Sequence, residues 1–352
     1  GLLEIMNGNR PSNRPEVYAE QADWISKNPL EEVTLQVVRI GELGITAIPC
    51  EVYGLTGLKL KSASPFPTTF NISLANGASG YIPPVEQHLL GGYTTWPART
   101  AALEVNAESR IVEEVTRLLE QTYGKPRNIY TEPDSSFSKA VLKAKPMAYW
   151  RLGEQKGSVA SDSSGNKHHA LYQDGVCFHL PGLHQLNQIE DHTSRSVHFA
   201  GGRVEASVPF SKSFTVQFWV WSGIINKNEH INNHIAELNG LNLNLINKQK
   251  SLQFKFLNML RRVDIDGIEP RSWNLVTLVA NPNSYEIWVN DVHHFDFKHD
   301  IITNDNVKVM RLVFGGDIEG KADFHGKLDE IAFFDRALTS KEIINLYNSS
   351  NP

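Results

Sequence analysis

Cysteine is scarce in this sequence, and neither sign of charge is in large excess. Its 352 residues include two cysteines, Cys50 and Cys177, which lie far apart and match no metal-binding or disulfide pattern. This scarcity leaves both reducing and oxidising compartments open. The 34 Lys and Arg against 39 Asp and Glu give a net charge of −5, whereas nucleic-acid binders usually carry a basic face. The balance therefore argues against nucleic acid as a partner.

Long apolar runs are also missing. No stretch approaches the roughly 20 apolar residues that cross a bilayer, so we expect no membrane span. Residues 1–24 lack a basic segment followed by an apolar core, so they are not typical of a signal peptide. The sequence does not begin with Met. We therefore expect a mature or excised piece of a longer protein.

The length favours two domains rather than one ordinary core, and the character of the sequence changes near residue 125. Residues 1–125 mix patterns of helices and strands. Residues 126–139 are polar, contain two prolines and lack periodicity, which is typical of a linker. Residues 140–352 read almost entirely as strands. The expected fold class is α+β in the first part and an all-β jelly-roll sandwich in the second.

Several local signals define the first part. Ile111, Val115, Leu118 and Leu119 recur on one face of an amphipathic helix, and Gly124 supplies a stop signal. Two apolar runs that meet around Gly41 have the spacing of a hairpin. The expected elements are strands over 33–40, 44–50 and 68–76, a short helix that begins after Glu51 and ends before Pro65, and a helix over 107–123.

The second part consists of short runs of aromatic and β-branched residues that are separated by Asn, Gly, Pro and Asp. Serial strands of this kind are typical of a sandwich or jelly roll. A final helix is expected at residues 338–350, where Thr339 and Glu342 have the spacing of a capping box. The clearest strand runs are 213–221, 251–257, 273–280 and 285–291.

The candidate chemistry in the first part centres on Glu51, which follows an apolar run directly. A carboxylate at the end of a strand can be a metal ligand or a general base, and it can equally be a surface or capping acid. Tyr81 sits in a turn rich in Gly and Pro that would hold it rigidly. Cys50 could be a nucleophile, but a lone cysteine beside a strand is usually a small buried hydrophobe. His88 is expected to face solvent.

Taken in order, these elements resemble the C-terminal part of the catalytic domain of neutral, non-lysosomal ceramidases. In that family a strand ends in Pro-Gly-Glu, and a later strand carries Leu-x-Asn before a Gly-Tyr turn and a further Tyr. Here the corresponding elements are 49–51, 74–76, 80–81 and Tyr93, and the resemblance covers roughly residues 30–120. Cys50 stands where the family has glycine.

The resemblance implies a zinc-dependent amide hydrolase that cleaves the N-acyl bond of ceramide. Glu51 and Tyr81 would be zinc ligands, and Tyr93 would be a catalytic residue close to the developing oxyanion. The family's two histidine ligands lie upstream of this region, whereas no histidine precedes Glu51 here. Two ligands are too few for such a site. We therefore expect an upstream polypeptide to complete the ceramidase-like domain.

The second part resembles the laminin-G-like, concanavalin A-like jelly rolls, on the strength of residues 148–172 and 325–347. The resemblance implies either a structural module or a module for a glycan or protein ligand. Such domains often hold a structural calcium, for which Asp162 and Asp329 are the candidate ligands. The His-His pairs at 168–169 and 293–294 are expected to face solvent, because adjacent residues on a strand point to opposite faces.

The leading hypothesis is the downstream portion of a secreted or periplasmic zinc-dependent amide hydrolase with an appended jelly roll. The alternative is a non-enzymatic binding or assembly protein. In that alternative the ceramidase-like piece is a catalytically dead remnant that packs on a partner chain.

Overall fold

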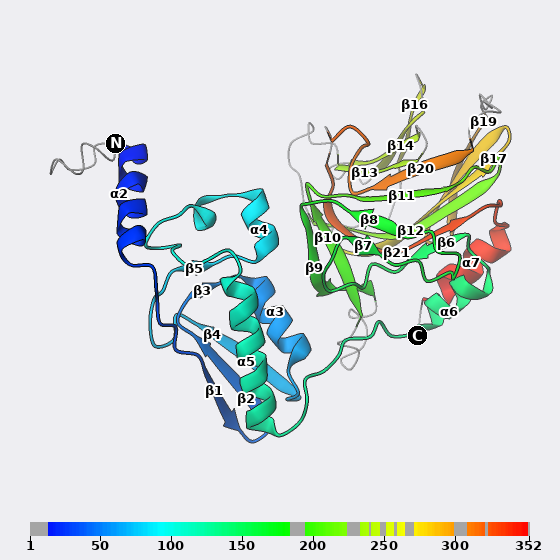
Figure 1. Ribbon diagram of the computed structural model, residues 1–352. Helices are drawn as coiled ribbons and strands as arrows, with labels where there is room; N and C mark the ends of the chain where they lie inside the picture. Colours follow the sequence, from blue (N-terminus) through cyan, green and yellow to red (C-terminus); the bar gives the residue numbers. More distant parts are fainter. Residues whose placement is uncertain are drawn as a thin grey trace. The chain divides into compact units, whose positions relative to one another are not determined.

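The computed structural model divides the chain into two compact units, Gly1–Tyr130 and Thr131–Pro352 (Figure 1). We call them unit 1 and unit 2 and describe each by itself. None of the helices in the described part of the chain combines the length and the apolar character that a membrane crossing needs. The structure describes residues 13–183, 194–223, 233–238, 241–246, 251–256, 259–264, 271–298, 308–320 and 323–350.

Unit 1 is a small α/β arrangement. β1 and β2 form the predicted antiparallel hairpin, and β2 pairs with β4 in parallel, so that α3 is the crossover between them. The elements are α2 (Arg14–Lys27), β1 (Gln36–Ile40), β2 (Leu43–Ile48), β3 (Glu51–Val52), α3 (Gly54–Ala63), β4 (Thr68–Ser73), β5 (Tyr81–Ile82), α4 (Val85–Leu90), the 3₁₀ helix η1 (Tyr93–Thr95) and α5 (Ala107–Tyr123).

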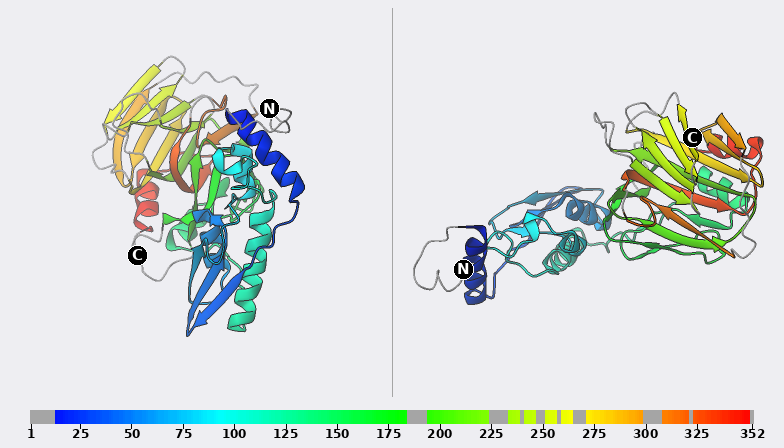
Figure 2. Two further views of the ribbon diagram at one scale, coloured as in Figure 1. Left: turned by 90° about the vertical axis from the view of Figure 1, so that its left-hand side faces the viewer. Right: turned by 90° about the horizontal axis from the view of Figure 1, so that it is seen from above.

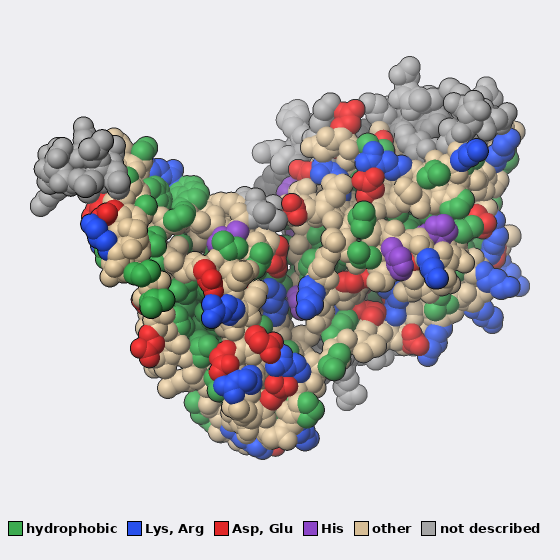
Figure 3. Space-filling model, viewed as in Figure 1, with side chains coloured by type: hydrophobic (Ala, Val, Ile, Leu, Met, Phe, Trp, Pro, Cys, Tyr) green, Lys and Arg blue, Asp and Glu red, His purple; other side chains and the backbone are tan. Residues whose placement is uncertain are grey.

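The core of unit 1 lies between the three-stranded sheet and α3 and α5. Helix α5 runs along one side of the strands (Figure 2), and its predicted apolar face supplies Ile111, Val115 and Leu119 to this core. A Cβ at Gly44 on β2 would lie 3.2 Å from the Leu119 side chain of α5, so the helix and the sheet pack closely here. The outward surface of α3 and α5 carries acidic and basic side chains interspersed (Figure 3).

Unit 2 is the predicted β-sandwich. Its described residues form two eight-stranded sheets, ordered β19-β18-β17-β12-β21-β10-β9, with β6 also on β21, and β16-β15-β14-β13-β20-β11-β8-β7. The strands are β6 (Ala148–Trp150), β7 (Val159–Ala160), β8 (Ala170–Tyr172), β9 (Val176–Pro181), β10 (Arg195–Ala200), β11 (Val204–Pro209), β12 (Phe214–Ser222), β13 (Asn233–Leu238), β14 (Leu241–Ile246), β15 (Ser251–Phe256), β16 (Met259–Asp264), β17 (Trp273–Asn281), β18 (Ser284–Val289), β19 (Val292–Lys298), β20 (Val309–Phe314) and β21 (His325–Phe334).

Two apolar layers hold unit 2 together. One fills the space between the sheets, with Trp150, Phe218 and Phe333 among its buried side chains. The other lies under α6 (Ser136–Lys143) and α7 (Ser340–Asn348), where Phe137 and Ile343 pack on the outer side of the first sheet. The expected capping box of α7 is present, because the Thr339 side chain accepts from the Glu342 N–H and the Glu342 carboxylate accepts from the Thr339 N–H.

The predicted linker over 126–139 contains the division between the two units, but most of it belongs to one unit or the other. Arg127 binds Glu120 of α5 at 2.9 Å. Further along, the Pro133 carbonyl accepts a hydrogen bond from Arg151 at 2.6 Å, and α6 begins before the predicted linker ends. A polar segment without periodicity can still be fixed by specific side-chain bonds, which composition does not reveal.

Candidate functional site

The structure brings Glu51, Tyr81 and Tyr93 together at one pocket of unit 1. The pocket has a volume of about 520 Å³. Glu51 comes from β3, Tyr81 from β5 and Tyr93 from η1. The other residues that line it are Val52, Tyr53, Ser73, Leu74, Gly91, Gly92 and Thr94.

A short parallel pairing of β3 with β5 sets Glu51 beside Tyr81. The two residues are direct partners in register, and the Glu51 N–H donates to the Gly80 carbonyl at 2.9 Å. Gly80 has a φ of +83°, and a Cβ there would lie 2.5 Å from the Thr100 carbonyl oxygen. Only glycine therefore allows the close approach that presents Tyr81 next to the carboxylate.

Ser73 fixes the other side of the pocket. Its hydroxyl donates to the Cys50 carbonyl at 2.8 Å and accepts from the Val52 N–H at 3.2 Å. These two bonds tie β3 to the end of β4, so both residues that flank Glu51 are held. In η1, Thr94 shares a 2.6 Å hydrogen bond with the Tyr53 hydroxyl, which anchors the segment that carries Tyr93.

Tyr81 lies at the centre of the group. Hydrogen bonds to Tyr93 and then to Glu51 raise the pKa of the Tyr81 phenol. The Tyr81 and Tyr93 rings meet edge to face, with centroids 5.5 Å apart and planes at 89°. Tyr93 is 65% exposed, so its hydroxyl is available to a ligand that enters the pocket.

The pocket lining contains two side chains of types that can bind zinc, those of Glu51 and Tyr81. A carboxylate and a phenol oxygen side by side are suitable metal donors, but catalytic zinc sites generally have three protein ligands. Among the described residues that line the pocket there is no histidine, cysteine or second carboxylate. Glu51 and Tyr81 therefore fit part of a zinc set, and the remaining donors would have to come from elsewhere.

Cys50 and His88 are the two other candidate residues of unit 1, and neither lines the pocket. Cys50 is fully buried, and burial, followed by the nearby Glu31 carboxylate, raises the pKa of its thiol to about 11. Because the thiolate is the nucleophile, this favours the buried apolar role. His88, which was expected to face solvent, lies in α4 and is half-buried, with its Nε2 inaccessible to solvent.

In unit 2, Asp162 binds the surrounding backbone. Its Oδ1 accepts from the N–H groups of Tyr149 at 2.9 Å and Ser164 at 2.8 Å, and its Oδ2 accepts from the His168 N–H at 2.9 Å. These bonds organise the turn after β7 and give Asp162 a structural role. Calcium binding by Asp162 and Asp329 stays a prediction.

Asp329 belongs to a buried group of charges on β21. Its Oδ2 accepts from the Leu183 N–H at 2.9 Å, and burial raises its pKa to about 7. The adjacent Glu330 is paired with Arg151 at 3.2 Å, and burial raises its pKa as well. Burial, with the Asp329 charge next, raises the pKa of Glu132 to about 8. The three carboxyl groups of this cluster outnumber the two cations near it, those of Arg151 and Lys327.

The Asp329 carboxyl predicts an unusual pH dependence for unit 2. Its pKa is about 7 when folded and 3.8 when unfolded, so the folded state binds more protons between these values. The free energy of unfolding should therefore fall as pH rises from 4 to 8. In the Asp329→Asn variant, the decrease in the free energy of unfolding between pH 4 and pH 8 should be smaller by on the order of 2–4 kcal/mol.

Urea unfolding of the full chain at pH 5 and pH 8, followed by tryptophan fluorescence, measures this effect. Five of the seven tryptophans lie in unit 2, namely Trp150, Trp219, Trp221, Trp273 and Trp288. Asp335→Asn is the matched control, because Asp335 is exposed. An equal pH dependence in Asp329→Asn and in the unsubstituted chain would contradict the prediction.

Sequence reasoning missed a possible metal-binding group on the β18–β19 hairpin. Glu286, His293 and Asp296 place one ligand atom each within 4.8 Å of one another, the one such group of three among the described residues. Glu286 and Asp296 are partners in register, and His293 Nε2 lies 2.8 Å from Asp296 Oδ1. Only the register of the hairpin could have revealed the cluster. His293 and Asp296 are exposed, as a surface ion pair would also be.

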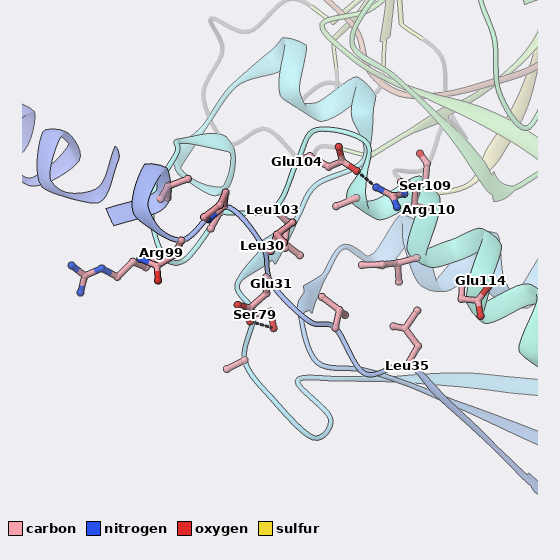
Figure 4. Close-up of a pocket in the computed structure, with 18 of the residues that line it drawn as sticks. Leu30, Glu31, Leu35, Ser79, Arg99, Leu103, Glu104, Ser109, Arg110 and Glu114 are labelled. Carbon is pink, nitrogen blue, oxygen red and sulfur yellow. Dashed lines mark hydrogen bonds and ion pairs between the residues drawn. The ribbon is translucent and has the colours of Figure 1, made fainter. Parts of the chain in front are cut away.

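A second pocket in unit 1 is larger, at about 1010 Å³, and lies between the segment that follows α2 and the first turns of α5 (Figure 4). Two pairs of its polar residues are bonded to each other. Arg110 binds Glu104, and the Ser79 hydroxyl donates to Glu31 at 3.0 Å. The apolar part includes Leu30, which is 90% exposed. No residue predicted for the site lines this pocket.

Comparisons with known proteins support the jelly roll. A family model described as the concanavalin A-like lectin/glucanases superfamily matches residues 195–344, which confirms the predicted fold for that region. No curated protein matches the chain. The ceramidase-like part of the prediction has no support from these comparisons.

Three solved structures illustrate the likeness in fold. The binding domain of Paraclostridial mosquitocidal protein 1 is 18% identical at a TM-score of 0.44, over 59% of this chain and 53% of that one. The receptor-binding domain of botulinum neurotoxin D is 18% identical at 0.42, over 59% and 53%. Domain 4 of AbnA, an arabinanase from Geobacillus stearothermophilus solved with arabinotriose, is 14% identical at 0.43, over 58% and 98%. The match thus spans about half the length of the first two, and likenesses this distant carry no functional argument.

Proposed function

We propose that the Glu51–Tyr81–Tyr93 pocket is half of the zinc site of an amide hydrolase similar to neutral ceramidases, and that an upstream polypeptide supplies the other half. One observation carries this proposal. Three residues that are separated along the chain by 30 and 12 positions converge on one pocket, where Glu51 and Tyr81 are partners in register and the Tyr81 and Tyr93 rings meet edge to face. A set of unrelated surface residues would have no reason to meet in this way.

Each residue has a distinct role in the proposed reaction. Glu51 and Tyr81 would hold zinc, whose chemistry when bound is to activate water and polarise the amide carbonyl. Tyr93 donates a hydrogen bond from its hydroxyl to the oxygen on which negative charge develops. Its contact with Tyr81 orients the Tyr93 ring. The bonds from Ser73 keep Glu51 in place, so that little rearrangement is needed when substrate enters.

Unit 2 would serve as a binding module for a glycan or a protein, appended to a secreted or periplasmic hydrolase. The match of residues 195–344 to the lectin and glucanase superfamily supports a binding role.

A second candidate function is non-enzymatic binding or assembly, with unit 1 as a catalytically dead remnant. The observation in its favour is the incomplete donor set, because the described residues at the pocket contribute only Glu51 and Tyr81 as metal ligands. The two candidates differ in whether the assembled protein contains zinc.

Metal analysis of the chain purified together with its upstream polypeptide separates the two candidates. We expect close to one equivalent of zinc in the unsubstituted protein. In Glu51→Ala the zinc content should fall to background, because this chain supplies only two ligands and the zinc site cannot form when one of them is lost. Glu42→Ala is the matched control, since Glu42 lies on the β1–β2 turn and outside the pocket. An assembled protein without zinc would overturn the hydrolase and favour the binding protein.

A further inference from the structure

The sheet of unit 1 has two chemically different faces. On β2, Gly44 faces Leu119 of α5, and Ile48 belongs to the core that Leu119 also joins, so both lie on the helix side of the sheet. Because side chains alternate along a strand, the intervening residues point the other way, and the pairing aligns them with their partners on β1 and β4. We call this side the outer face. It consists of Gln36, Val38, Ile40, Leu43, Ile45, Ala47, Thr68, Phe70 and Ile72.

The outer face is apolar and exposed. None of its nine residues is charged, and seven are hydrophobic. Val38 is 50% exposed, Ile40 63%, Phe70 40% and Ile72 44%. A contiguous apolar patch that continues over three strands marks an interaction surface rather than an ordinary solvent face.

The pairing of the strands indicates what covers this surface. β2 and β4 are parallel and joined by α3, while β1 joins the sheet antiparallel. Sheets of parallel strands are normally covered by helices on both faces. Here α3 and α5 cover one face, and the described elements of unit 1 leave the strongly exposed residues of the other without a helical layer. Because no charge lies on the outer face, the covering helices must present an aliphatic, uncharged side.

The outer face also leads to the candidate site. β4 carries Phe70 and Ile72 on the outer face, and the chain continues directly into Ser73 and Leu74, which line the Glu51 pocket. Leu74 is itself 48% exposed. A polypeptide that lies on the outer face along β4 would therefore reach the edge of the Glu51 pocket. There it could supply the metal donors that the pocket lacks besides Glu51 and Tyr81.

We propose that the outer face is the docking surface for a separate polypeptide, which lays an amphipathic helical layer on the sheet and contributes the missing donors at the pocket. The choice of occupant rests on the proposed function, because a metal site with two ligands needs further ones. A second copy of this chain would fit less well, since it would bring a sheet rather than helices and the same two donors again.

The affinity of the complex tests this surface directly. The probe is the polypeptide encoded ahead of Gly1 in the same reading frame, produced separately and titrated against the full chain. Ile40→Glu and Ile72→Glu should each weaken binding by at least about 30-fold, because a charge buried in the interface replaces an apolar contact. Ile129→Glu is the matched control, because Ile129 is 87% exposed and lies off the sheet. Equal affinity for all three variants, or no complex at all, would overturn the proposal.

Cysteine substitutions test the same surface with less disturbance of the fold than a buried charge. Thr68→Cys places a thiol on the outer face, and Lys61→Cys places one on α3 as the control. We expect reagent labelling of Thr68→Cys to become at least about 10-fold slower in the complex, while labelling of Lys61→Cys is unchanged. A complex in which Thr68→Cys stays reactive would overturn the proposal, as would a dimer of the chain alone that protects it. Protection without bound zinc would instead overturn the hydrolase and leave the docking surface intact.

Discussion

Tyr93→Phe should reduce kcat for hydrolysis of an N-acyl amide about 100- to 1,000-fold in the assembled protein, without loss of zinc. The substitution keeps the ring, and with it the edge-to-face packing on Tyr81, but removes the hydroxyl that we propose donates to the developing oxyanion. Since Tyr93 is not one of the proposed ligands, the metal content should stay at the unsubstituted value. Steady-state kinetics and metal analysis on the same preparation measure both quantities.

Tyr123→Phe supplies the control for the loss of a tyrosine hydroxyl. Tyr123 ends α5, and its hydroxyl donates to Glu42 at 2.6 Å, outside the pocket. Its kcat should stay within about twofold of the unsubstituted protein, since surface changes far from a site have small effects. If Tyr93→Phe retained the same kcat as Tyr123→Phe, Tyr93 would have no part in the reaction.

Arg151→Ala should destabilise unit 2 by about 3–5 kcal/mol, because it leaves the buried Glu330 carboxylate without its cation. The Arg151 side chain is only 10% exposed and Glu330 only 2%, and the pair lies at 3.2 Å. Arg151 also donates to the Pro133 carbonyl at 2.6 Å. The same substitution therefore releases the segment that precedes α6. Urea unfolding at pH 7, followed by tryptophan fluorescence, measures the loss.

A surface ion pair in the same unit provides the comparison. Arg311 binds Glu205 with its side chain 45% exposed, so Arg311→Ala should cost no more than about 1 kcal/mol. The double variant Arg151→Ala with Glu330→Gln should recover part of the larger loss, because it removes the uncompensated charge. If Arg151→Ala and Arg311→Ala cost the same, burial would not be what makes the Arg151 pair important.

The local elements could be predicted because their signals lie within one turn or one strand. Thr339 and Glu342 are three residues apart and form the expected capping box. The apolar repeat of α5 and the stop at Gly124 likewise depend on adjacent residues, and the structure confirms both. The jelly roll was predicted from its serial strands and bracketing motifs. Its strand order could not be, because the pairings in a sandwich join residues far apart in sequence.

The candidate site shows where such prediction ends. Glu51, Tyr81 and Tyr93 could be named from the resemblance, but β3 and β5 are two residues each and carry no periodicity. Their pairing depends on the approach of Gly80 to Thr100. Arg151 and Glu330 are 179 positions apart in the sequence, and no sequence pattern predicts that they pair. Buried charges of this kind are fixed by tertiary packing, which no local pattern in the sequence predicts.

The location of bound zinc tests the central claim most directly. Crystals of the chain assembled with its upstream polypeptide can be measured with X-rays on either side of the zinc absorption edge. We expect one anomalous peak within coordination distance, about 2.0–2.2 Å, of the Glu51 carboxylate, with the Tyr81 phenol also bound. A peak only at Glu286, His293 and Asp296, or no peak in the assembled protein, would contradict the proposed half-site.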